Sequence, residues 1–216
     1  MPQTFTPTSV LLLKLAAMLA CALVLGAALV WRWAITPAAA RGAALIQPIP
    51  FSHQHHVGEV GLDCRFCHTT VERSAFAGMP STQTCLTCHS QLFLDAPMLA
   101  PLHASAASGK PIAWQRVHDL PDFVYFDHHI HVNKGVACQA CHGRVDRMPL
   151  MLRQAPLDMQ WCLGCHRAGG GALRPLSEVF LMGDSRPLSA ADLAQLRRLM
   201  QLQSRSRLQD CSTCHR

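Results

Sequence analysis

The pattern Cys-x-x-Cys-His occurs five times in this chain of 216 residues and contains ten of its eleven cysteines. The first cysteines of the five copies are Cys64, Cys85, Cys138, Cys162 and Cys211. The second cysteines are Cys67, Cys88, Cys141, Cys165 and Cys214, and the trailing histidines are His68, His89, His142, His166 and His215. The eleventh cysteine, Cys21, lies in an apolar N-terminal segment. No second cysteine remains outside the motifs to form a disulfide with it.

This spacing fits the covalent attachment of haem c. The two thiols of each motif add to the two vinyl groups of one porphyrin, and the histidine that follows lies under the iron as its proximal ligand. A zinc site needs pairs of cysteines but no histidine after each pair. A redox-active dithiol normally occurs once, on a βαβ scaffold. We therefore predict five covalently bound haem c groups, each with one iron.

The N-terminal segment VLLLKLAAMLACALVLGAALVWRW is long and apolar enough to cross a bilayer as one helix. We predict a tail over residues 1–9 and a transmembrane anchor over residues 10–34. A cleaved signal peptide is the alternative, because Ala38-Ala39-Ala40 resembles a cleavage site. Haem c is attached outside the cytoplasm, so we expect a single-pass protein of the bacterial inner membrane with its haem-binding body on the periplasmic side.

The formal charge of +6 does not indicate a nucleic-acid partner. Five haems would add about ten propionate groups, which outweigh the excess of Lys and Arg. We therefore expect a membrane-bound protein that binds no nucleic acid.

Two stretches of the chain are copies of each other. FSHQHH precedes the first motif and FDHHIH precedes the third, and a short Val-acid-Arg sequence follows each of these motifs. A further motif closes each copy, so the body contains two tandem dihaem units and a fifth haem. The predicted parts are a linker (35–50), the first dihaem unit (51–95), a second linker (96–119), the second dihaem unit (120–167) and a C-terminal helix with the fifth haem (168–216).

Few residues of the body are suited to a conventional core, since aromatic residues are only 6% of the chain. We predict a mainly α fold with much irregular structure, in which short helices begin or end at the motifs and the body is wrapped around five haems. Residues 96–110 have the composition of a linker. Ser189 is suited to cap a helix that continues to about Arg205, with Asp192 at its third position.

The Phe-x-His-x-x-His segments resemble those of multihaem cytochromes of the c3/c7 type. That resemblance implies that His53, His56, His128 and His131 are distal iron ligands, the first of each pair to the haem that follows and the second to another haem. A spacing of three residues also puts both histidines on one side of a helical turn. We expect His55, His129 and His103 to face solvent, or propionates in the case of the first two.

One haem is left without a distal histidine. His118 is one candidate for its sixth ligand, and a methionine thioether is the other. The methionines near the motifs are Met148, Met151, Met159 and Met79, and a methionine ligand would raise the potential of that haem relative to the others. Two protein ligands on every iron leave no open position for a substrate, which favours electron transfer over catalysis.

The body also resembles the pentahaem cytochrome subunit of alternative complex III. The resemblance rests on FSHQHHVGEVGLDCRFCH, RVHDLPDFVYFDHHIHVNKGVACQACHGRVDRMPLM, LDMQWCLGCHR and DCSTCHR, and on the N-terminal anchor. It implies an electron-transfer subunit that is not itself a complete enzyme. The implied partners are polytopic quinol-binding membrane subunits, an iron–sulfur or molybdopterin-like subunit, and a monohaem cytochrome c or a terminal oxidase.

Two other functions remain open on the sequence. The first is a tethered quinol-dehydrogenase cytochrome that feeds a periplasmic reductase. The second is a multihaem reductase in which one haem keeps an open position.

Overall fold

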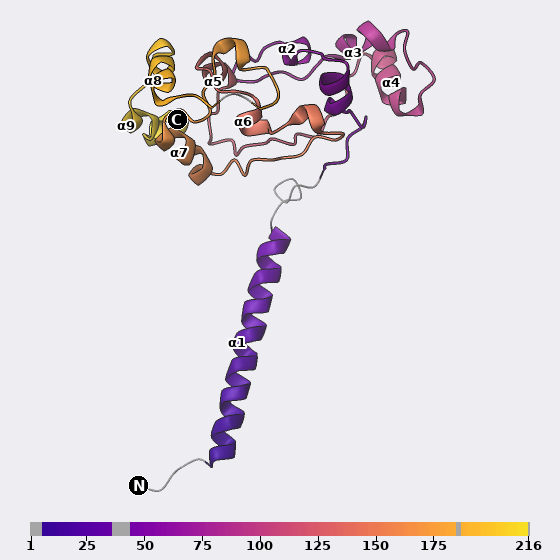
Figure 1. Cartoon of the computed structure of the whole chain (residues 1–216). Helices are drawn as coiled ribbons and strands as arrows, with labels where there is room; N and C mark the ends of the chain where they lie inside the picture. The colour runs from indigo at the N-terminus through magenta and orange to yellow at the C-terminus, as the bar shows by residue number, and fades with distance from the viewer. Residues whose placement is uncertain (1–5, 36–43, 185–186, 216) are drawn as a thin grey trace.

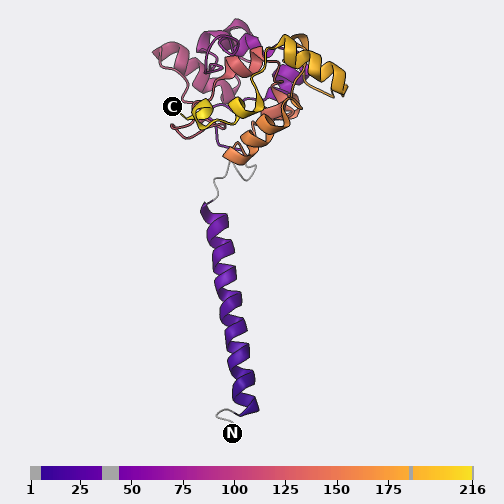
Figure 2. The same ribbon diagram turned by 90° about the vertical axis from the view of Figure 1, so that its left-hand side faces the viewer.

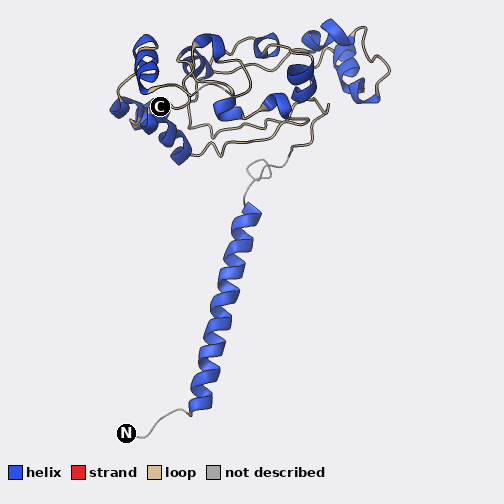
Figure 3. Cartoon of the chain, in the orientation of Figure 1, coloured by secondary structure: helices blue, strands red, loops and turns tan. Residues whose placement is uncertain are grey.

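The computed structural model describes residues 6–35, 44–184 and 187–215, and this part of the chain is mainly helical. Figure 3 shows no strand in it, and its only β-type pairing is an isolated antiparallel bridge between Val136 and Leu173. The α-helices are α1 (Pro7–Ile35), α2 (Cys64–Cys67), α3 (Thr82–His89), α4 (Ala100–Ser108), α5 (His128–Asn133), α6 (Gln139–His142), α7 (Met159–Ala168), α8 (Ala190–Leu199), α9 (Arg205–Leu208) and α10 (Cys211–Cys214). A π-helical turn, η2 (Gln54–Glu59), and three short 3₁₀-helices, η3 (Pro97–Leu99), η4 (Val145–Arg147) and η5 (Leu176–Glu178), complete the described helices.

Helix α1 stands apart from the body in both views of the ribbon (Figures 1 and 2). Its 29 residues give a length of about 43 Å, more than the hydrocarbon core of a bilayer, which is about 30 Å thick. Its side chains are exposed on all sides, as expected for a helix that lipid surrounds. Length and composition fit a membrane anchor and also a signal sequence. Residues 36–43, which include the possible cleavage site, lie outside the described residues.

The body has a small side-chain core. Only ten apolar residues are buried in the described part of the chain: Ile49, Val71, Leu99, Leu102, Val132, Ala137, Val145, Met148, Leu173 and Val179. Six of them form two separate clusters, with Ile49, Leu99 and Leu102 in one and Val71, Val132 and Val179 in the other. Clusters of three residues bury too little apolar surface to offset the entropy of ordering a body of this size. A large apolar group inside the body is therefore needed for stability.

The two copies of the repeat are interlocked by reciprocal contacts. The histidine segment of the first copy lies on the segment after the third motif, where the Gln54 amide donates to the Met148 carbonyl at 3.0 Å. The histidine segment of the second copy lies in the same way on the segment after the first motif, where the His129 amide donates to the Ser74 carbonyl at 3.2 Å. These positions are equivalent in the repeat. The copies are therefore related by an approximate two-fold arrangement, and neither is closed without the other.

Gly58 and Asn133 occupy equivalent positions in the two contacts. A Cβ atom on Gly58 would overlap the carbonyl oxygen of Asp146 in η4, so η2 and η4 approach closely only because residue 58 is glycine. At the other contact the Asn133 side-chain amide donates to the carbonyl of Glu72 at 3.0 Å. The first contact therefore depends on a close approach of two backbones and the second on a side-chain hydrogen bond.

Two local predictions differ from the structure. Residues 100–108, to which composition assigned a linker, form helix α4 and bury Leu102 and Ser105. The Ser105 hydroxyl is 2.6 Å from that of Thr82 and donates to the Lys110 carbonyl at 2.5 Å, so tertiary contacts stabilise a helix of small residues.

Ser189 does cap helix α8, and with Asp192 it forms a capping box. The helix ends at Leu199, however, and not near Arg205. The Lys134 ammonium group donates to the Met200 carbonyl at 2.7 Å, and Gln201 has a positive φ of 49°. The chain therefore leaves the helical path after Leu199. Leu199, the last residue of the helix, is 65% exposed.

The close approach of η2 and η4 at Gly58 predicts that a larger residue at this position lowers the stability of the protein. Gly58→Ala forces η2 and η4 apart, and overpacking of this kind costs about 1–3 kcal/mol. We expect a lower midpoint of thermal unfolding, followed by circular dichroism of the haem-loaded protein. Gly171→Ala is the matched control, because nothing lies within 4 Å of a Cβ at that exposed glycine. Equal midpoints for the two variants would show that the interlock does not limit stability.

Candidate haem-binding sites

Each attachment motif lies on a short helix, and side-chain caps fix where four of these helices begin. Asp63 and Asp210 immediately precede a first cysteine and cap α2 and α10. Ser81 and Asp158 precede a first cysteine by four residues and cap α3 and α7. Residues three apart share one side of a helical turn, so both thiols of a motif lie on one face. All of these thiols are free.

Four of the trailing histidines are held by a backbone carbonyl at Nδ1. The distances are 2.7 Å from His68 to Gly78, 3.2 Å from His89 to Leu92, 2.7 Å from His166 to Leu208 and 2.8 Å from His215 to Phe123. A carbonyl only accepts, so Nδ1 carries the proton and Nε2 presents a lone pair. This is the usual arrangement of an imidazole that binds a metal through Nε2.

The fifth trailing histidine, His142, is held differently. Burial, and after it the neighbouring His118 and His128, lower its pKa to about 3. The ring is therefore neutral at physiological pH, which is the form that binds a metal.

The two histidine segments present their imidazoles in the same way. The Nδ1 atoms of His56, His128 and His131 lie 2.9 Å from the Ser52 carbonyl, 2.8 Å from the Ala75 carbonyl and 2.7 Å from the Asp127 carbonyl, respectively. Phe51 and Phe126 stack on the rings of His56 and His131, with centroids 4.3 Å and 4.5 Å apart. The order that the two copies share, Phe before two histidines, thus orients each second histidine by a carbonyl and an aromatic face.

Three of these histidines face a trailing histidine at one common distance. The ring centroids are 6.2 Å apart for His56 and His89, 6.3 Å for His128 and His142, and 6.3 Å for His131 and His166. A first-row metal bonds an imidazole nitrogen at about 2.0–2.1 Å and the ring centre lies about 1 Å beyond, so two imidazoles on opposite sides of one metal have centres about 6 Å apart. The three pairs therefore fit one iron each.

His53 lies near His68 in the same copy of the repeat. Burial, and after it the neighbouring His68, lower the pKa of His53 to about 4. Its Nδ1 is buried and has no hydrogen-bond partner. The equivalent pair in the second copy is His128 and His142, which is spaced for an iron.

The intervening histidines of the two segments pair with carboxylates. His55 Nδ1 is 2.8 Å from Glu59, and His129 Nδ1 is 2.5 Å from Asp127. Both side chains are partly exposed. Both contacts are made through Nδ1 and leave Nε2 outside the pair, so the absence of His55 and His129 from the ligand set stays a prediction.

The remaining candidates lie mainly beside the third motif. The His118 ring is 4.4 Å from that of His142, nearly perpendicular to it, and its Nε2 is buried without a partner. Met148 is buried, with its methyl group against Gly143, while Met151 is partly exposed. At the fifth motif the aromatic neighbour of His215 is Phe123, at 5.9 Å. Which of these residues is a sixth ligand stays a prediction.

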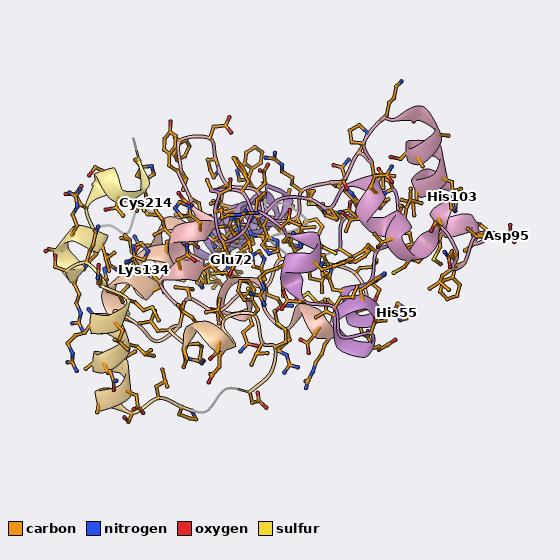
Figure 4. The ribbon with its side chains drawn as sticks, turned by 90° about the horizontal axis from the view of Figure 1, so that it is seen from above. His55, Glu72, Asp95, His103, Lys134 and Cys214 are labelled. Atoms are coloured by element: carbon orange, nitrogen blue, oxygen red, sulfur yellow. The ribbon has the colours of Figure 1, made fainter. Side chains whose placement is uncertain are left out.

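His103 is placed differently from what the sequence indicated. It lies on α4 and not in a solvated linker, and its Nε2 is buried without a hydrogen-bond partner. Figure 4 shows His103 and Asp95 at one end of the body, Cys214 at the opposite end, and Glu72 between them.

The surroundings of the motifs fit a bound macrocycle. Phe76, Met79 and Phe93, which lie between or beside the first two motifs, are each more than 60% exposed in the chain alone. A porphyrin would cover such apolar surface, which isolated monomeric proteins rarely leave in patches. Within the described residues, no three His, Cys, Asp or Glu side chains converge to hold a bare metal ion.

The comparisons with known proteins agree with this chemistry. No protein-family model matches the chain. The chain is similar to the "Menaquinone reductase, multiheme cytochrome c subunit" of Nitratidesulfovibrio vulgaris (strain Hildenborough), with 40% identity over 102 residues. The match covers 47% of this chain and 48% of that protein, so the chain spans about half the length of its relative. The likeness supports a multihaem cytochrome c with covalently bound haem.

The paired spacing predicts the effect of removing one histidine of a segment. His131→Ala leaves His166 without its facing ring, so we expect one haem per chain to change from low-spin to high-spin ferric iron in electron paramagnetic resonance spectra. His129→Ala is the matched control, because His129 is on the same helix but pairs with Asp127. A high-spin signal from the control, or none from His131→Ala, would contradict the pairing.

Proposed function

We propose that this chain is a membrane-anchored pentahaem c-type cytochrome that relays electrons for a quinol-oxidising membrane complex. It receives them through an iron–sulfur partner and passes them to a cytochrome c or a terminal oxidase. The observation that carries the proposal is the combination of five attachment motifs with three pairs of imidazoles, each pair spaced so that one iron fits between its two rings. Covalently bound haem supplies the reversible one-electron chemistry of its iron.

The residues of the chain perform three tasks in this function. The five cysteine pairs, from Cys64–Cys67 to Cys211–Cys214, fix the position of each group. The trailing histidines would each supply one iron ligand, and His53, His56, His128 and His131 would supply the second ligand of four haems. The carbonyls at Nδ1 hold the rings in one orientation, so the ligand sphere changes little between oxidation states, as fast electron transfer requires.

The partner assignment follows from the likeness to quinone-linked cytochromes. The relative is named as a subunit of a menaquinone reductase, which supports a place in a quinone-linked membrane complex. The resemblance to alternative complex III adds the polytopic quinol-binding subunits and the iron–sulfur or molybdopterin-like subunit. We place the body on the periplasmic side of the bacterial inner membrane, where haem c is attached, with α1 as the anchor.

The name of the relative also favours a second candidate, in which electrons flow in the opposite direction, towards menaquinone. The two directions place the haem potentials on opposite sides of the quinone couple. A redox titration of the purified chain against that couple therefore separates them.

Haem content and carbon monoxide binding test the proposal. We expect the purified chain, with α1 intact, to exceed its polypeptide mass by five haem groups. We also expect the spectrum of the dithionite-reduced protein to be unchanged by carbon monoxide, since the proposal gives each iron two protein ligands.

A carbon monoxide band from about one fifth of the haem would instead favour a multihaem reductase with one open iron. Cys211→Ser/Cys214→Ser then shows whether the open iron belongs to the fifth motif. Loss of the band in that variant would locate it there. Fewer than five haem masses would refute the pentahaem assignment itself.

A further inference from the structure

We infer that the five attachment motifs form a single row whose order in space is second, first, third, fourth, fifth. The row therefore does not follow the order of the motifs along the chain. This inference rests on the proposed five-haem function, because the order of the motifs sets the order of the groups that they hold.

The first and second motifs are neighbours. Cys67 of the first motif interacts electrostatically with Cys85 of the second. His56, which precedes the first motif, faces His89 of the second motif with ring centroids 6.2 Å apart. His53, three residues earlier, interacts with His68 of the first motif. One histidine segment thus reaches both motifs.

The first and third motifs are also neighbours. Their first cysteines, Cys64 and Cys138, share a thiol–thiol hydrogen bond, which raises the pKa of Cys138. Both lie near Phe180 and Val179, since the Cys64 thiol is 3.8 Å from the Phe180 carbonyl and the Cys138 amide donates to the Val179 carbonyl at 3.1 Å. The motifs that open the two copies of the repeat therefore meet at the approximate two-fold axis.

The third and fourth motifs repeat the relation of the first and second. His128 faces His142 of the third motif and His131 faces His166 of the fourth, each at 6.3 Å. Cys141 of the third motif also interacts electrostatically with Cys165 and Cys162 of the fourth.

The fifth motif adjoins the fourth. The chain just before it supplies the Leu208 carbonyl, 2.7 Å from His166 Nδ1. Cys162 of the fourth motif interacts electrostatically with Cys214 of the fifth. The fifth motif therefore continues the row beyond the fourth and does not return to the first copy of the repeat.

The ribbon agrees with this order. In Figure 1, α3 of the second motif lies towards one end of the body, α2 and α6 of the first and third motifs lie in the middle, and α7 and the C-terminus lie at the other end. Figure 4, seen from above, places Asp95 and Cys214 at opposite ends. The interlock of the copies explains the exchange, because a two-fold arrangement puts the first motif of each copy inside and the second outside.

The order identifies the second and fifth motifs as the two ends of the relay. A redox centre of a partner protein comes nearest to the row at one of these ends. The first, third and fourth motifs lie between them, so each connects two neighbours.

Distances from a spin label test the order. In a Cys21→Ser background, a nitroxide is attached at Asp95→Cys beside the second motif, or at Ser206→Cys on α9 beside the fifth; both positions are exposed. Pulsed dipolar electron paramagnetic resonance measures the distances from the label to the ferric haems. Paired Cys→Ser variants that remove one haem at a time identify the origin of each distance.

From residue 95, we expect Cys85→Ser/Cys88→Ser to remove the shortest distance and Cys64→Ser/Cys67→Ser the next. From residue 206, the fifth and fourth motifs should account for the two shortest. A second-shortest distance from residue 95 that disappears in Cys138→Ser/Cys141→Ser would overturn the order. If a deletion variant does not accumulate, His56→Ala keeps all five haems attached and identifies the second haem by its high-spin signal.

Haem content separates failure of the order from failure of the proposed function. Five haem masses with a different sequence of distances would refute only the order. A shortfall of haem would refute the function on which the order rests.

Discussion

The structure of the body depends on two histidines that share one helical turn and reach two different attachment motifs. In the first copy of the repeat, His53 lies near His68 while His56 faces His89. In the second, His128 faces His142 while His131 faces His166. A spacing of three residues fixes the separation of the two rings on each turn. Each turn therefore fixes the distance between two neighbouring motifs.

This constraint explains how a body with so small a side-chain core can hold a definite shape. The buried clusters contain three residues each, and the copies meet at one of these clusters and at a few hydrogen bonds to backbone carbonyls. Folding of the chain is therefore coupled to occupation of the sites, in the way that metal binding supplies folding energy in small metalloproteins. The close contact at Gly58 and the hydrogen bond of Asn133 then set the angle between the copies.

The sequence was informative where covalent or local rules apply. Motif spacing predicted which helices bear cysteines, and the capping box at Ser189 predicted where α8 begins. It was uninformative where distant contacts decide the structure. Helix α4 is stabilised by the Thr82–Ser105 contact. Helix α8 ends early beside Lys134, which belongs to the second copy of the repeat. The exchange of the first and second motifs in the row arises from the interlock, and no local pattern in the chain encodes it.

The likeness to a quinone-linked cytochrome covers about half of each protein, so the central claim rests on the axial ligands of this chain itself. Near-infrared magnetic circular dichroism of the oxidised protein counts haems by their ligand pairs and tests it directly. The account predicts at least four haems with two histidine ligands among five, and no high-spin haem. Fewer than four haems of the two-histidine type would contradict it.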